Sequence, residues 1–101
     1  MKIEELRATR ITACPGGLIW AAEAMLYGEG MKKVFVTYAE DDIGEHFTVA
    51  AESVYDFLVN NLDEAPEFAE EYEEQKDAKK SVYGPVFAYL RKTARSMGEV
   101  A

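Results

Sequence analysis

The chain has 101 residues, 49% of them hydrophobic, and its 11 basic and 19 acidic side chains give a formal net charge of −8. This size and apolar content predict one folded domain over residues 1–101 and exclude a disordered chain. The acidic balance gives no counterion-release drive toward DNA or RNA, so we expect no nucleic-acid partner.

The apolar runs, the N-terminal charges and the cysteine count indicate the cell compartment and the cofactors to expect. The longest apolar run, residues 16–26, is interrupted by Glu23 and is far shorter than the roughly 20 residues that span a bilayer. Charges stand near the N-terminus where a secretory signal would be apolar. Cys14 is the only cysteine, which forbids an internal disulfide and is too few thiols for a zinc knuckle. We therefore expect a cytoplasmic protein with no membrane contact, no cofactor and no metal.

The first half of the chain is typical of β-strands. Residues 3–12 alternate between apolar and polar side chains with one slip, which suggests a bulge. Residues 18–27 are ambiguous, because their alanine-rich centre favours a helix by propensity. Their period-two apolar pattern and the short glycine-bearing connection at 28–30 favour a strand, which is our prediction. Further strands are predicted over 31–40 and 46–50.

The second half is typical of helices. Ser53 suits the N-cap of a short helix, and Pro66 suits the first residue of a second helix that runs to about Lys80. A third helix is predicted to begin after Gly84 and to end at Gly98. The predicted fold class is therefore α+β, an antiparallel meander of about four strands packed by about three C-terminal helices.

The acidic segment 63–80 is the most distinctive part of the chain. On a helix, its glutamates would share one face opposite Phe68 and Tyr72, and that face would point to solvent. It is either an ordinary solvated surface or a surface that steers a basic partner. If this helix and the last one pack as an antiparallel pair, Arg91 and Arg95 would meet its carboxylates. The four glutamates that we select as partner-binding residues are Glu67, Glu70, Glu71 and Glu74.

Three groups of residues are candidates for a chemical site. Cys14 and His46 are a thiol and a base, but no local signature joins them, so we assign no catalytic residue. The carboxylates and histidine of residues 40–46 have the ligand types of a hard-cation site but match no EF-hand spacing, so we assign no metal ligand. Glu23 lies inside an apolar strand, where the open face of the sheet is a commoner place than a buried site.

These observations favour a non-enzymatic protein-interaction or regulatory module. We expect a protein partner, with a basic protein as one option, and self-association through the sheet face as another. Two alternatives stay open. One is an immunity or anti-defence inhibitor that mimics nucleic acid with its carboxylates. The other is a small enzyme that uses Cys14 and His46.

Overall fold

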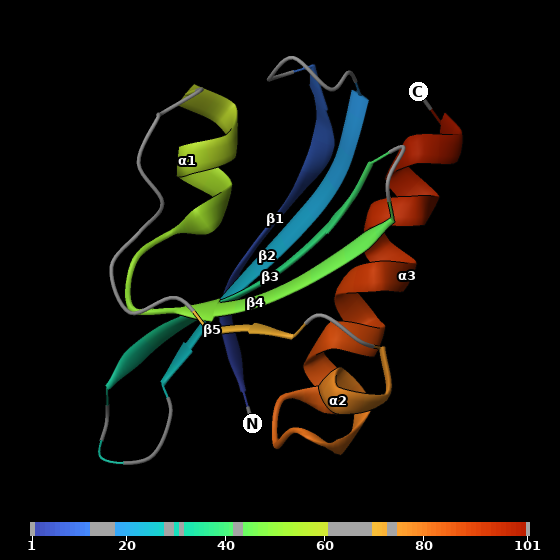
Figure 1. Ribbon diagram of the computed structural model, residues 1–101. Helices are drawn as coiled ribbons and strands as arrows, with labels where there is room; N and C mark the ends of the chain where they lie inside the picture. The colour runs from blue at the N-terminus through green and yellow to red at the C-terminus, as the bar shows by residue number, and fades with distance from the viewer. Residues whose placement is uncertain are drawn as a thin grey trace.

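The computed structural model describes residues 2–12, 18–27, 30, 32–41, 44–60, 70–72 and 75–100. These residues form a five-stranded sheet and flanking helices (Figure 1). The strands are β1 (Ile3–Thr12), β2 (Leu18–Tyr27), β3 (Lys33–Glu40), β4 (Glu45–Ala50) and β5 (Glu70–Tyr72). The helices are α1 (Val54–Asn60), α2 (Gln75–Lys80) and α3 (Gly84–Val100).

The sheet is a meander in which each strand pairs antiparallel with the next, in the order β1-β2-β3-β4-β5. The predicted α+β class and the antiparallel four-strand meander are confirmed, and β5 extends the sheet beyond β4. The slip in alternation between Ala8 and Ile11 is not a bulge, because β1 keeps a regular register with β2 there, and the irregularity of this pairing lies between Ile3 and Glu5 instead. Because β1 and β5 are the first and last strands, they form the two edges of the sheet.

The ambiguous segment is strand β2, as predicted. It pairs with β1 on one side and β3 on the other, so both edges of its backbone have hydrogen-bonding partners. Ala22, Ala24 and Leu26 face one core, while Ala21 faces a second. Burial on both faces outweighs the helical propensity of the alanines because propensity is worth less than about 1 kcal/mol per residue.

Helix α3 covers one face of the sheet (Figure 1). Its inward side chains recur at helical spacing and pack on alternate residues of the central strands. Phe47 contacts the rings of Tyr38 and Phe87, at centroid distances of 5.4 and 5.3 Å. The buried α3 residues of this core are Val86, Phe87, Leu90 and Ala94.

Helix α1 lies against the other face, so the sheet has a helix on each side (Figure 1). There Tyr55 and Leu58 of α1 pack on Ala21 and Ala39. As predicted, Ser53 caps this helix, because its Oγ accepts a hydrogen bond from the N–H of Asp56 at 3.0 Å.

Two helix predictions are wrong. Residues 66–80 are not one helix, because Glu70–Tyr72 is strand β5 and only Gln75–Lys80 is helical within the described part of that segment. Pairing with β4 supplies backbone hydrogen bonds and overrides the local helical preference of the glutamates. Helix α3 does not stop at Gly98 but continues to Val100, since one glycine in a helix costs only about 1 kcal/mol.

Among the described helices, none has both the length and the apolar character needed to cross a bilayer.

Candidate functional site

The carboxylate of Glu23 is buried in the centre of the sheet, with 1% of its side chain exposed. The expectation that it lies on an open sheet face is therefore wrong. Residue 23 is on the α1 side of β2, and the first turn of α1 covers it. A buried carboxylate needs hydrogen-bond donors, and Glu23 has them on both oxygens.

The donors come from two neighbouring strands and from the start of α1. Arg7 of β1 donates to Oε1 at 2.8 Å, and the Ser53 hydroxyl donates to the same oxygen at 2.6 Å. The backbone N–H of Tyr55 donates to Oε2 at 2.9 Å, and the Thr37 hydroxyl of β3 also donates to Oε2. One carboxylate thus ties β1, β2, β3 and the start of α1 together.

Arg7 completes this network. Its second terminal nitrogen donates to Asp56 of α1 at 2.6 Å, and its guanidinium lies 5.0 Å from the centre of the Tyr55 ring. Burial by itself lowers the pKa of Arg7, but the hydrogen bonds to Asp56 and Glu23 outweigh it and raise that pKa. Burial raises the pKa of Tyr55, and the negative charge of Glu23 adds to the effect. These polar contacts join residues of the chain to one another, so the network acts as a latch that holds α1 on the sheet.

The strand register explains how these residues meet. Arg7 lies opposite Glu23, and Glu23 lies opposite Thr37, in one row across three strands. Directly opposite residues on antiparallel strands point to the same face and lie close together. Sequence reasoning noted Glu23 but missed Arg7, Thr37 and Ser53 as its partners, because the register was not known.

A second polar cluster lies where β3 ends, at Glu40, and β4 begins, at Glu45. Arg91 Nε is 2.6 Å from Glu45 Oε2, and Arg95 Nε is 2.9 Å from Glu40 Oε2. The prediction that these arginines meet carboxylates of the preceding helix is therefore wrong. Helix α3 runs across the sheet, so the flank that carries both arginines faces the ends of β3 and β4.

The hydroxyl of Tyr38 lies between the two carboxylates and is 2.9 Å from Glu45 Oε2. It also donates to Glu40 Oε2. Burial, and then the hydrogen bonds to Glu40 and Glu45, raises the pKa of Tyr38 well above its ordinary value. The hydrogen bond from Tyr38, supported by Arg95, holds the pKa of Glu40 below its ordinary value.

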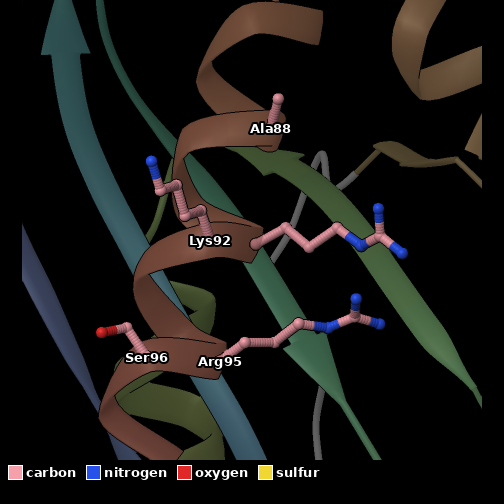
Figure 2. A pocket seen from close by; sticks show the side chains of 5 residues that line it. Ala88, Lys92, Arg95 and Ser96 are labelled. Carbon is pink, nitrogen blue, oxygen red and sulfur yellow. The ribbon is translucent and has the colours of Figure 1, made fainter.

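A shallow groove runs over the outer surface of α3 beside this cluster (Figure 2). Figure 2 shows Arg95 reaching from the helix toward the strands and Lys92 pointing to the other side. All of the lining residues belong to one helix, and Arg91 and Arg95 already pair with Glu45 and Glu40. The groove therefore has little charge left for an anionic ligand.

The selected acidic residues are not arranged as predicted. Glu70 and Glu71 are successive residues of strand β5, so they do not share a helical face. Glu67 and Glu74 lie outside the described residues, as does Cys14.

His46 lies on β4, with Nε2 3.1 Å from Asp41 Oδ2. In the part of the chain that the structure describes, no three metal-binding side chains cluster.

The outer edge of β1 is a third feature. Among the described strands, β2 alone pairs with β1, so the other edge of this ten-residue strand has no strand beside it. Leu6 lies on the α3 face of β1 and is 41% exposed. Tyr89 of α3 is 50% exposed, and it lies two residues, about 200° of helix rotation, from Arg91. Because Arg91 faces β4, Tyr89 lies on the flank toward β1.

Comparison with known proteins gives no relative: no family model matches the chain, and neither a curated protein nor a solved structure matches it.

Proposed function

We propose that the chain is a cytoplasmic protein-interaction module that binds its partner along the outer edge of β1. The observation that carries the proposal is the length of this unpaired edge. A strand edge presents backbone N–H and C=O groups that can pair with a strand of another chain. Within the described residues the other sheet edge, β5, has three residues, so β1 offers the longer row of such groups there.

Side chains beside this edge support the proposal. Leu6 and Tyr89 place apolar surface on the α3 side of β1, where it would contact the side chains of an added strand. In strand addition the backbone supplies affinity, and alternate side chains supply specificity. The single cysteine agrees with a reducing compartment such as the cytoplasm.

The test is affinity capture from native cell extract with three versions of the chain as bait. Leu6→Lys places a charge on the proposed surface, and its aliphatic stem can still cover the neighbouring apolar atoms. Val82→Lys is the matched control, because Val82 is 71% exposed and lies in the connection between α2 and α3 rather than on β1. We expect the wild type and the control to retain the same proteins and Leu6→Lys to lose them. Equal retention by all three baits would show that this edge is not the binding surface.

Steering of a basic partner by Glu67, Glu70, Glu71 and Glu74 stays a separate prediction. It no longer rests on a shared helical face, and it now depends only on the local density of negative charge.

A further inference from the structure

We propose that the partner of the β1 edge is a second copy of the same chain, paired antiparallel through β1 with Leu6 on the twofold axis. This inference rests on the proposed function, because it names the partner of that same edge. It follows from the distribution of charge along the strand, which selects one register.

A twofold axis between two antiparallel strands is perpendicular to the sheet, so it places one residue directly opposite its own copy. Like charges that lie directly opposite each other are destabilising. An axis at Glu5 would pair two carboxylates, and an axis at Arg7 would pair two guanidinium groups. An axis at Ala8 avoids both of these like-charge pairs. It places Arg7 of one copy opposite Thr9 of the other, so Arg7 gains no ion pair.

An axis at Leu6 satisfies both charge and apolar contact. It places the exposed Leu6 side chains of the two copies together and pairs Glu5 of each copy with Arg7 of the other. Glu5 is exposed and 39% of the Arg7 side chain is exposed, so Glu5 of one copy would add to the carboxylates of Glu23 and Asp56 that Arg7 of the other copy already binds. The two opposite-charge pairs and the leucine pair are the kind of cross-strand contacts that stabilise sheets.

The bulge in β1 does not prevent this pairing. It lies between Ile3 and Glu5, so residues 5–7 of each copy pair regularly with residues 7–5 of the other, and Ala8 of one copy faces the bulge of the other. The same twofold axis places α3 of both copies on one side of a continuous ten-stranded sheet. The Tyr89 side chains would then flank the leucine pair from both sides.

The test uses cysteine cross-linking in a Cys14→Ser background, where the introduced thiol is the only one. Directly opposite residues have Cα atoms about 4.5 to 5.5 Å apart, which a disulfide can bridge. Leu6→Cys should therefore form a disulfide-linked dimer under mild oxidation. Thr9→Cys should not, because in this register the two copies of residue 9 are offset by six positions, roughly 20 Å.

Val82→Cys controls for random collision, since residue 82 is the more exposed. We expect several-fold more linked dimer from Leu6→Cys than from either control. Molar mass of the wild-type chain in solution is measured over a range of concentrations as well, so that a variant that fails to fold does not decide the outcome. Equal cross-linking at all three positions, or a wild-type chain that is monomeric throughout, would overturn the second-copy proposal.

These results separate this proposal from the proposed function. A monomeric wild type whose Leu6→Lys bait still loses captured proteins would remove the second copy as partner and keep β1 as the binding edge. A dimer that persists in Leu6→Lys and does not cross-link through residue 6, together with equal retention of captured proteins by the Leu6→Lys bait, would remove both.

Discussion

At the scale of single residues, Arg7 is the charged hydrogen-bond donor to the buried carboxylate of Glu23. The substitution Arg7→Met leaves the buried carboxylate with neutral donors only, so we expect it to lower the free energy of unfolding by about 2 kcal/mol. This is less than the value for a fully buried pair because Arg7 is partly exposed. Urea denaturation at constant protein concentration measures the change.

A double-substitution cycle tests whether the two charges are coupled. Glu23→Gln should destabilise the wild type, but it should cost less, or even stabilise, in the Arg7→Met background, where it removes an unpaired buried charge. Lys92→Gln, an exposed change on α3, should stay within about 0.5 kcal/mol. Additive effects of the two substitutions would contradict the proposed latch.

Glu40 predicts a specific dependence of stability on pH. Its pKa is lowered in the folded state from an ordinary value of 4.5, chiefly by the hydrogen bond from Tyr38. A lowered carboxyl pKa means that its stabilisation is fully present above pH 4.5 and is lost as the pH falls through the folded-state value. We expect Glu40→Gln to cost about 1 kcal/mol near neutral pH and almost nothing in strong acid.

The measurement is the free energy of unfolding of the wild type and Glu40→Gln at several pH values. The two curves should converge as the pH falls below 4.5. A difference that stays constant with pH would show that the carboxylate of Glu40 is not selectively stabilised in the folded state.

At the scale of elements, α3 depends on the fit of its inward side chains. Leu90 has no exposed surface and lies in the core between α3 and the sheet. We expect Leu90→Ala to lower the free energy of unfolding by about 2 to 5 kcal/mol, because it removes apolar contacts and leaves a cavity. Ser96→Ala, on the exposed side of the same helix, should have little effect. Similar denaturation midpoints for both variants would contradict the observed packing.

At the scale of the whole molecule, pairing through β1 links stability to concentration. A folded dimer that dissociates on unfolding becomes more stable as protein concentration rises, by mass action. The melting temperature of the wild type should therefore rise with concentration, while that of Leu6→Lys should stay constant. Val82→Lys should behave as the wild type. Thermal denaturation of all three at several concentrations provides the measurement.

Local patterns sufficed for much of the fold. The period-two alternation of β2 and the hydroxyl of Ser53 before a short apolar stretch each lead to the observed element. Both depend on interactions within a few residues, which a sequence displays directly. The sequence also shows the unusual carboxylate of Glu23 within an apolar strand, although it does not show that this carboxylate is buried.

The segment around Glu70 shows where local reasoning fails. Its glutamates favour a helix, but pairing with β4 decides for a strand, and that pairing joins residues more than twenty positions apart. The partners of Glu23 have the same origin, since Arg7 and Thr37 meet it only through the strand register. The ion pairs of Arg91 and Arg95 likewise depend on which flank of α3 faces the strand ends.

The sequence by itself therefore determined the class of the fold, the order of its first four strands and the acidity of its surface. Only the tertiary structure decided that Glu23 is buried, that the arginines of α3 pair with β3 and β4, and that β1 is a long free edge among the described strands. The physical reason is the distance along the chain over which each interaction acts. Periodicity and capping act between neighbours in the chain, whereas burial, charge pairing and sheet edges depend on which distant segments pack together.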